Sequence, residues 1–209
     1  MHKPISGIYG ILPADIALDD LLFRAESALN GGIRVLQIRD KKQGFKYKCK
    51  RAGALRELTL RYHATLFVND SAAIANAVDA DGVHLGKSDI HTMQQLRTQL
   101  SDDMVVGVTC RADAVMAKHA LEQGADYISL GAIFATTTKA DVPVIGLPRL
   151  QKARTLFPQA NIVAIGGIDL ETLAAIRLAG ADSAAVISSL FESSDIESMA
   201  RMMVDAWHG

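Results

Sequence analysis

The stretch Gly180-Ala181-Asp182-Ser183-Ala184-Ala185-Val186-Ile187-Ser188 joins the end of a predicted helix to a buried strand and then to a polar strand end. Gly180 suits the left-handed position that ends a helix, and residues 183–187 form an apolar run typical of a strand in a parallel sheet. The same order of turn and apolar run occurs at residues 79–83 and 124–128. Each copy is interpreted as a connection from a helix to a strand, a helix stop with no chemistry of its own.

Outward from these turns, eight short apolar runs rich in Val, Ile and Leu alternate with longer amphipathic stretches. The runs lie at 7–13, 33–39, 65–69, 80–85, 104–109, 127–133, 161–165 and 183–187. Eight strands with room for a helix after each, at about 26 residues per unit, predict an α/β fold of the (βα)8 TIM-barrel type rather than a doubly wound sheet. No linker or low-complexity tract divides the chain, so residues 1–209 are expected to form a single domain.

The long helix expected after the second strand has Lys48, Arg51 and Arg56 between its apolar positions. This spacing is typical of an outer helix with one face on the barrel, so the basic side chains are expected to form a solvated face. The net charge of −1 and the lack of a long run of like charges argue against nucleic acid or an anionic membrane as a partner.

Cys49 and Cys110 are the only cysteines in the sequence, and they lack the C-x-x-C spacing of redox or metal sites. Two lone thiols fit a reducing compartment, so both are expected to be reduced in a cytoplasmic protein. The segment after Met1 contains only a short apolar stretch broken by Gly7 and Gly10, which predicts neither a signal peptide nor a membrane span.

The carboxyl ends of the strands carry the chemistry of a (βα)8 barrel. The second strand ends in Gln37-Ile38-Arg39-Asp40-Lys41, and alternation puts Gln37 and Arg39 on the same inward face. Burial of two polar side chains without partners is costly, which favours a site for an anion or a heterocycle, with Lys41 as a second cation.

Two acidic residues follow the next two strands. Asp70 comes after Asn69 at the end of the third strand, and Asp89 follows the fourth strand, which contains His84. Because Mg²⁺ usually takes one or two carboxylates and completes its shell with water and phosphate oxygens, Asp70 and Asp89 form a candidate half-site. Capping of the following helix is an equal alternative for Asp70. His84 is interpreted as a packed, hydrogen-bonded structural residue.

The fifth and sixth strands end in hydroxyl groups. Thr109 could bond a phosphate or cap the following helix, while Cys110 has no identifiable base and is interpreted as inert. The long loop after the sixth strand contains Thr136-Thr137-Thr138-Lys139. Three hydroxyls and an ammonium group supply the donors and the charge that a phosphate needs, which favours a phosphate-binding loop over a merely solvated one.

Glycine and serine follow the last two strands. Gly166-Gly167 comes after the seventh strand, and Ser188 comes after the eighth. Loops at these positions of a barrel commonly bind phosphate through backbone N–H groups and the start of a helix. A tight turn without a ligand also needs glycine, so this feature indicates a phosphate but no particular reaction.

Together these blocks resemble the thiamine-phosphate synthase family, in the same order and over nearly the whole chain. The blocks are Gln37-Ile38-Arg39-Asp40-Lys41, Asn69-Asp70, His84-Leu85-Gly86-Lys87-Ser88-Asp89, Thr136-Thr137-Thr138-Lys139, Ala164-Ile165-Gly166-Gly167-Ile168 and Val186-Ile187-Ser188. The resemblance implies a transferase that couples hydroxymethylpyrimidine diphosphate to thiazole phosphate with the help of Mg²⁺. The products would be thiamine phosphate and pyrophosphate.

The resemblance also implies a role for each matching residue. It places the pyrimidine diphosphate on Gln37, Ile38, Arg39, Asp40, Lys41, Asn69, Thr109 and Lys139, and magnesium on Asp70 and Asp89. It places the thiazole phosphate on Thr136, Thr137, Thr138, Gly167, Ile187 and Ser188. The catalytic cations would be Arg39, Lys41 and Lys139. The expected partners are therefore small phosphorylated molecules, and association into a homo-oligomer stays open.

Three positions depart from the family pattern. Asp40 stands where the family more often has Glu, and Ser71 stands where Arg is frequent. Thr109 replaces the usual Ser and keeps the hydroxyl, so only the fine geometry of a diphosphate contact is affected.

Two other functions use the same fold. A thiazole tautomerase binds thiazole phosphate but has no diphosphate to ionise, and a non-catalytic barrel would only bind phosphate. The synthase is favoured by residues that these alternatives do not need, namely Asn69, Asp70, Asp89 and Lys139.

Overall fold

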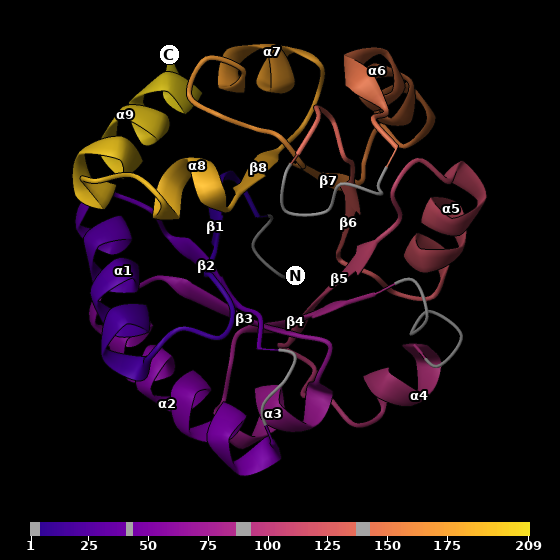
Figure 1. The fold of residues 1–209 in the computed structure, drawn as a ribbon. Coiled ribbons are helices and arrows are strands. Elements are labelled where there is room, and N and C mark those ends of the chain that lie inside the picture. The colour runs from indigo at the N-terminus through magenta and orange to yellow at the C-terminus, as the bar shows by residue number, and fades with distance from the viewer. Residues whose placement is uncertain (1–4, 41–43, 87–92, 137–142) are drawn as a thin grey trace.

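The computed structural model of the chain describes residues 5–40, 44–86, 93–136 and 143–209, and its strands form a closed parallel barrel (Figure 1). The strands are β1 (Gly7–Ile11), β2 (Val35–Ile38), β3 (Thr65–Asn69), β4 (Gly82–Leu85), β5 (Val105–Thr109), β6 (Tyr127–Leu130), β7 (Asn161–Ile165) and β8 (Ser183–Val186). Each strand pairs with its neighbour in sequence, and β1 also pairs with β8, which closes the sheet. The predicted barrel is confirmed, and every strand coincides with a predicted apolar run or lies within it.

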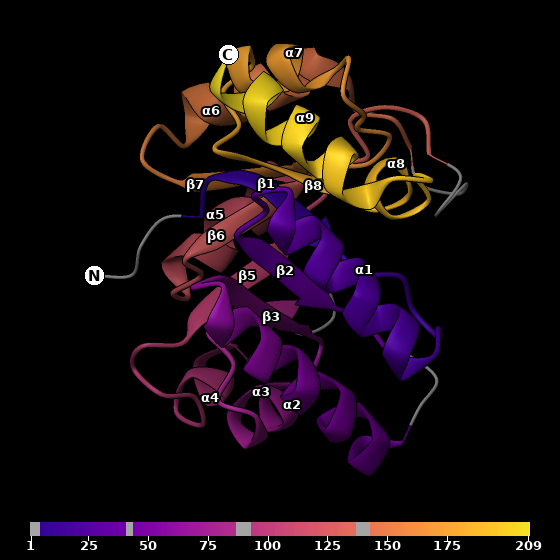
Figure 2. The same ribbon diagram turned by 90° about the vertical axis from the view of Figure 1, so that its left-hand side faces the viewer.

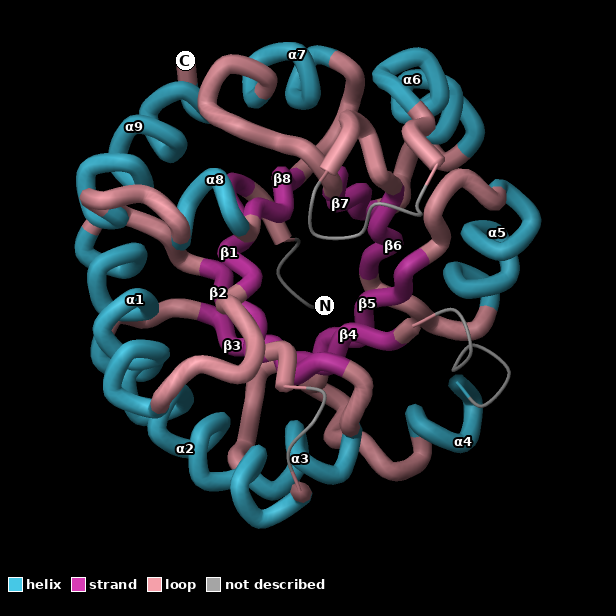
Figure 3. Tube along the Cα trace, in the orientation of Figure 1, coloured by secondary structure: helices cyan, strands magenta, loops and turns pink. Residues whose placement is uncertain are grey.

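Helices surround the barrel on its outside (Figure 3). They are α1 (Leu18–Asn30), α2 (Phe45–Arg61), α3 (Ala72–Ala77), α4 (Met93–Arg97), α5 (Ala114–Glu122), α6 (Gly146–Leu156), α7 (Leu173–Leu178), α8 (Ser188–Phe191) and α9 (Ile196–His208). The prediction of one helix after each strand holds except after β8, where the short α8 precedes α9. α9 packs against both α1 and α7, so it completes the outer ring (Figures 1 and 2). In the described part of the chain, no helix is long and apolar enough to cross a membrane.

Two apolar cores follow from the alternation of side chains along the strands. In β6, Ile128 and Leu130 face outward and join the large core between the sheet and the helices. Tyr127 faces inward and joins a smaller core that fills the barrel, together with Tyr9 and Phe67. The rings of Tyr9 and Phe67 lie 5.5 Å apart, and those of Phe67 and Tyr127 lie 5.6 Å apart. The barrel interior below its mouth is therefore packed with aromatic rings.

Two strand glycines make room for these rings. A Cβ atom on Gly82 would lie 2.3 Å from the Phe67 ring, and one on Gly107 would lie 1.9 Å from the Tyr127 ring. These separations are far below van der Waals contact, so any side chain at either glycine would displace an aromatic ring. The Tyr127 ring can thus point into the barrel only because Gly107 of β5 has no side chain.

The repeated turns brace the amino end of the barrel. Before β8, Asp182 Oδ2 accepts hydrogen bonds from the Arg154 guanidinium (2.5 Å) and from the backbone N–H of Ile162 (2.7 Å). Gly180 has a φ of +99°, which confirms the predicted left-handed helix stop. In the other copies, Asp81 accepts hydrogen bonds from Arg56 and from the Leu66 N–H, and Asp126 accepts from Arg97 and from the Val106 N–H. The turns therefore do more than stop a helix, and the prediction that Arg56 is solvated is wrong because it carries one of these ion pairs.

The variant Asp182→Ala tests the brace. We expect it to lower the free energy of unfolding by about 2 kcal/mol, because a backbone donor and a guanidinium lose their shared acceptor. Chemical denaturation measures the change. Asp102→Ala is the matched control, at an exposed aspartate outside the braces, and should change stability by less than about 0.5 kcal/mol. Equal losses in the two variants would show that the brace contributes nothing.

Candidate active site

One rim of the barrel collects the predicted site residues that the structure describes. Arg39 follows β2, Asp70 follows β3, Thr109 ends β5, and Gly167 and Ser188 follow β7 and β8. Because all strands are parallel, these positions share the carboxyl rim of the barrel. The predicted site residues outside the described part of the chain are Lys41, Asp89, Thr137, Thr138 and Lys139.

The end of β2 holds one polar side chain in a fixed position and leaves another without a partner among the described residues. Gln37 is buried, and its Nε2 donates a hydrogen bond to Oδ1 of Asn69 at the end of β3 (2.9 Å). Arg39 is partly buried, and its guanidinium has no hydrogen bond or ion pair with any residue that the structure describes. A fixed amide pair therefore lies next to a cation that is available to bind an anion.

The Asp40 carboxylate serves the scaffold. It accepts hydrogen bonds from Nε (2.7 Å) and Nη2 (3.3 Å) of Arg51, and both side chains are buried. Arg51 also donates to the carbonyl of Ile16 (2.6 Å). The prediction that Arg51 lies on a solvated face of α2 is wrong, because this guanidinium neutralises a buried carboxylate. The side chain of Ile38 packs in the outer core. Any ligand contact at Asp40 or Ile38 must therefore come from the backbone.

Asp70 lies at the rim in a left-handed backbone conformation. Its φ is +59°, which is uncommon outside glycine, and its N–H donates to the His84 carbonyl (2.8 Å). The residue that caps α3 is Ser71, whose side chain accepts a hydrogen bond from the N–H of Ile74 (3.3 Å). The capping alternative for Asp70 is therefore wrong. Its exposed carboxylate bonds to no other described residue and is available to a ligand.

His84 belongs to a hydrogen-bonded chain inside the mouth. Its Nδ1 lies 2.8 Å from the Tyr127 hydroxyl, and its Nε2 lies 2.8 Å from Thr109 Oγ1. These partners confirm the prediction of a packed, hydrogen-bonded histidine. The capping alternative for Thr109 is wrong, because Asp113 caps α5 by accepting a bond from the Met116 N–H (3.0 Å).

Burial keeps the hydroxyl groups of Tyr9 and Tyr127, at the inner end of this hydrogen-bonded chain, protonated. It raises the pKa of the Tyr9 hydroxyl well above its usual value, and the neighbouring Tyr127 adds to this shift. Burial likewise raises the pKa of Tyr127. Both tyrosines therefore carry a phenolic proton at neutral pH.

Cys110 is not a nucleophile. Burial raises the pKa of its thiol to about 12, with a further contribution from the negative charge of Asp113. A raised pKa leaves the protonated, unreactive thiol dominant until the pH approaches that value. We therefore expect iodoacetamide at pH 8 to alkylate the partly exposed Cys49 and to leave Cys110 unmodified in the folded protein, as measured by mass spectrometry. Fast labelling of Cys110 would contradict this interpretation, and unfolding in urea should expose both thiols as the control.

The loops after β6, β7 and β8 lie in close contact. A Cβ on Gly166 would lie 2.5 Å from the Ala132 side chain, and one on Gly167 would lie 2.3 Å from the Ala135 carbonyl oxygen. Both glycines also have positive φ, so the turn requires glycine even without a ligand. Ser189 Oγ donates to the Ile168 carbonyl (2.7 Å), which ties the start of α8 to this turn.

The described residues near α8 leave several donors at the rim. Ile187 immediately precedes α8, and Ser188 is its first residue. The Ser188 hydroxyl makes no hydrogen bond within the described chain. In the first turn of α8, the N–H groups of Leu190 and Phe191 donate to the Ile187 carbonyl (3.3 and 2.9 Å), so the backbone donors that can face a ligand there are those of Ser188 and Ser189. Thr136 does have an interaction of its own and is partly buried. The rim thus offers donors where the sequence predicted a phosphate.

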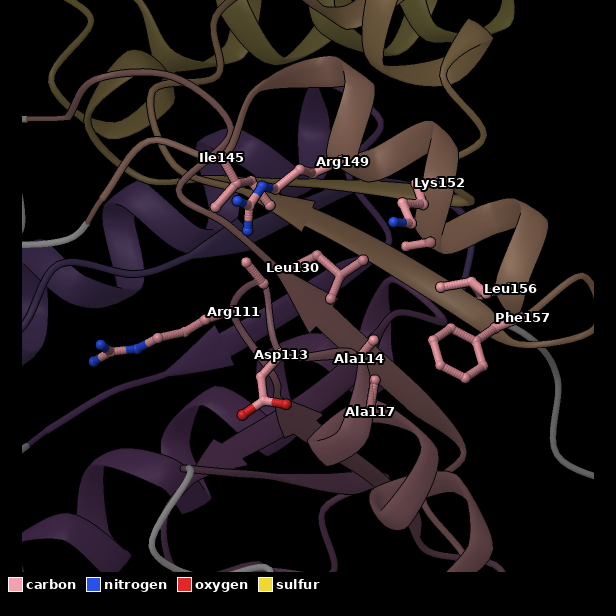
Figure 4. A pocket seen from close by; sticks show the side chains of 12 residues that line it. Arg111, Asp113, Ala114, Ala117, Leu130, Ile145, Arg149, Lys152, Leu156 and Phe157 are labelled. Carbon is pink, nitrogen blue, oxygen red and sulfur yellow. The ribbon is translucent and has the colours of Figure 1, made fainter.

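A separate hollow lies outside the barrel, between α5 and α6 (Figure 4). It has a volume of about 300 Å³ and an apolar floor that includes Leu130 and Ala117. Arg149 and Lys152 of α6 line its edge. None of the predicted site residues that the structure describes lines this hollow, which sets it apart from the described part of the mouth. No group of three or more potential metal ligands occurs among the described residues.

A closed parallel barrel that carries Arg39, Asp70 and the Gly166-Gly167 turn at its carboxyl rim has the architecture of a TIM-barrel enzyme. The family model described as thiamine monophosphate synthase matches residues 8–190. The chain therefore belongs to the thiamine monophosphate synthase family.

Individual relatives agree with the family. The thiamine-phosphate synthase of Methylobacillus flagellatus is 40% identical over 198 residues, which cover 95% of this chain and 93% of the relative. The thiamine-phosphate synthase of Alcanivorax borkumensis is 41% identical over 207 residues, which cover 97% of this chain and 94% of the relative. The structure of thiamine phosphate pyrophosphorylase from Pyrococcus furiosus matches with a TM-score of 0.86 at 29% identity, covering 97% of this chain and 95% of that one. The similarity thus extends over the whole barrel and its rim, and the chain is a transferase.

Proposed function

We propose that the chain couples hydroxymethylpyrimidine diphosphate to thiazole phosphate and releases pyrophosphate. The observation that carries this proposal is that Arg39 and Asp70 have no ion-pair partner among the described residues. They follow neighbouring strands, carry opposite charges, and make no ion pair with each other or with any other described residue. A free guanidinium suits a diphosphate and a free carboxylate suits a divalent cation, so a metal–diphosphate substrate satisfies both.

The substrates divide the rim between them. The pyrimidine diphosphate would lie on Gln37, Arg39, Lys41, Asn69, Thr109 and Lys139, with backbone contacts at Ile38 and Asp40. The thiazole phosphate would lie on Thr136, Thr137, Thr138, Gly167, Ile187 and Ser188. The hydrogen bond from Gln37 Nε2 to Asn69 leaves the side-chain oxygen Oε1 of Gln37 as an acceptor for the amino group of the pyrimidine.

The donor set fits magnesium. Asp70 presents an exposed carboxylate without a protein donor in the described part of the chain, and hard oxygen ligands are those that Mg²⁺ prefers. Asp89, outside the described residues, would complete the pair. When bound, the ion would neutralise charge on the diphosphate.

The protein's own groups then promote departure of pyrophosphate. Arg39, Lys41 and Lys139 would stabilise the negative charge that develops on the leaving group, in a mouth with an aromatic floor. The electron-rich aminopyrimidine stabilises the cation that remains, and the thiazole nitrogen attacks its carbon from a fixed position. No protein nucleophile is needed, which agrees with the protonated, buried Cys110. The free cysteines are consistent with our proposal that the enzyme acts in the cytoplasm.

A substrate-omission experiment tests the proposal. With both substrates and Mg²⁺, ³¹P NMR should show loss of the diphosphate signals and appearance of free pyrophosphate. With thiazole phosphate alone in D₂O, the thiazole should remain unchanged. Isomerisation or deuterium uptake by the thiazole alone, without pyrophosphate release when both substrates are present, would assign the chain to the tautomerase. Binding without any turnover would assign it to the non-catalytic barrel.

A further inference from the structure

A chain of hydrogen bonds runs through the barrel interior to the mouth. Tyr9 and Tyr127 have their hydroxyl oxygens 3.2 Å apart, and Tyr127 contacts Nδ1 of His84 at 2.8 Å. His84 Nε2 contacts Thr109 Oγ1 at 2.8 Å. Ser129 Oγ also donates to Thr109 Oγ1, at 3.4 Å. Residues from β1, β4, β5 and β6 thus form one polar path that ends at the rim.

The closed end of this path determines the direction of its hydrogen bonds. Tyr9 is 1% exposed and lies in the inner apolar core, and Tyr127 is the only hydrogen-bond partner of its hydroxyl within the described chain. The Tyr9 hydroxyl is protonated, and a buried donor needs an acceptor. Tyr9 must therefore donate to the oxygen of Tyr127.

The same donor-to-acceptor order continues from Tyr127 to the rim. Since Tyr127 accepts from Tyr9, its own proton is free to be donated to Nδ1 of His84. A neutral imidazole that accepts at Nδ1 carries its proton on Nε2, so His84 donates to Thr109. Thr109 also accepts from Ser129, and with both lone pairs occupied its single proton is available for another acceptor. Thr109 is partly buried at the carboxyl end of β5, so that acceptor lies in the mouth.

We propose that His84 is a positioning residue, held by Tyr127 as the Nε2–H tautomer so that Thr109 donates its hydroxyl proton to an anionic oxygen of the ligand in the mouth. The identity of that ligand, a diphosphate, rests on the proposed function. The direction of the hydrogen bonds rests only on the packing around Tyr9.

The opposite direction is unfavourable at both ends. His84 would carry its proton on Nδ1 and donate to Tyr127, which would donate to Tyr9. The Tyr9 proton would then have no acceptor among the described residues of the inner core. Thr109 would also use its only proton on His84 Nε2, and would present no donor to an anion.

Long-range ¹H–¹⁵N NMR of the ¹⁵N-labelled protein at pH 7.5 reads the tautomer directly. The His84 signals are assigned by their loss in His84→Gln. We expect an unprotonated Nδ1 and a protonated Nε2 in the wild type. A proton on Nδ1, or on both nitrogens, overturns the proposal whatever the activity of the enzyme.

Two tyrosine variants test the direction. Tyr127→Phe removes the donor to Nδ1, so His84 should become a mixture of tautomers. Tyr9→Phe is the matched variant and should keep the Nε2–H form, because Tyr127 can still donate to His84. A Tyr9→Phe protein in which His84 changes tautomer contradicts the proposed direction, since only the reverse chain needs Tyr9 as an acceptor.

Kinetics link the tautomer to the ligand. Tyr127→Phe should raise the KM for the pyrimidine diphosphate by about tenfold, the effect of one misdirected hydrogen bond, and leave the KM for thiazole phosphate unchanged. Equal rises in both constants would show a merely structural role and overturn the proposal. A wild type that has the Nε2–H tautomer but releases no pyrophosphate would refute the proposed function alone.

Discussion

Asp70→Ala is expected to lower magnesium-dependent turnover by about two orders of magnitude or more. The free energy of unfolding should fall by no more than about 1 kcal/mol, because alanine tolerates the left-handed conformation of residue 70 less well than aspartate does. The carboxylate is exposed and bonds to no other described residue, so its removal breaks no hydrogen bond or ion pair within the described part of the chain. It does remove one of two oxygen ligands proposed for the ion that neutralises the diphosphate. Steady-state pyrophosphate release and thermal unfolding measure the two quantities, and Asp89→Ala should behave in the same way.

Ser71→Ala is the matched control for Asp70→Ala, because Ser71 is the residue that caps α3. It should lower stability by about 1 kcal/mol, the usual cost of a lost helix cap, and keep turnover near that of the wild type. The reverse pattern would contradict the metal assignment. In that case Asp70→Ala would cost stability with little change in rate, and Asp70 would be a structural residue.

Lys139→Ala should lower the coupling rate by roughly two to three orders of magnitude, as loss of one preorganised charge-stabilising group typically does. Its ammonium group is proposed to stabilise the departing pyrophosphate, whereas Gly167 and Ser188 are proposed to hold the thiazole phosphate. The affinity for thiazole phosphate should therefore change much less. Rates of pyrophosphate release and calorimetric titration of thiazole phosphate separate the two effects.

Lys152→Ala is the control for Lys139→Ala, because Lys152 is an exposed lysine of α6 that lines the hollow outside the barrel. It should leave the coupling rate near that of the wild type. If Lys139→Ala weakens thiazole phosphate as much as it slows coupling, the lysine binds the monophosphate. It would then no longer distinguish a synthase from a tautomerase.

The fold could be predicted from the sequence because its signals are local. Each apolar run and each glycine helix stop lies within a few residues, and the number of runs alone distinguishes a closed barrel from an open sheet. Gly124 and Gly180 adopt the left-handed conformations that their positions predict. The carboxyl rim was predictable for the same reason, because a parallel barrel places every strand end at one edge.

Contacts between distant residues were beyond the reach of the sequence. Helical spacing made Arg51 appear to be an ordinary outer-face residue, and only the fold brings it to Asp40 at the end of β2. Tyr9 and Tyr127 are 118 residues apart, and their contact depends on Gly107 leaving room for a ring. The inward alternation of Tyr127 and Ser129 in the sixth apolar run was the one signal that could have indicated this polar path.

The sequence spacing allowed Asp70 and Thr109 to be either helix caps or ligand contacts, and neighbouring residues decided the capping question. Ser71 and Asp113 cap the helices that Asp70 and Thr109 were also placed to cap. In both cases the helix begins one or more residues later than the strand end suggests, so the cap position passes to the next suitable side chain. Neither rim residue therefore serves as a helix cap.

A single-turnover reaction, with enzyme in excess over both substrates and quenched at intervals, tests the central claim most directly. The account predicts that pyrophosphate and thiamine phosphate form in equal amounts and at the same rate, and that EDTA suppresses both. Absence of pyrophosphate, or equal rates with and without a divalent metal ion, would contradict it.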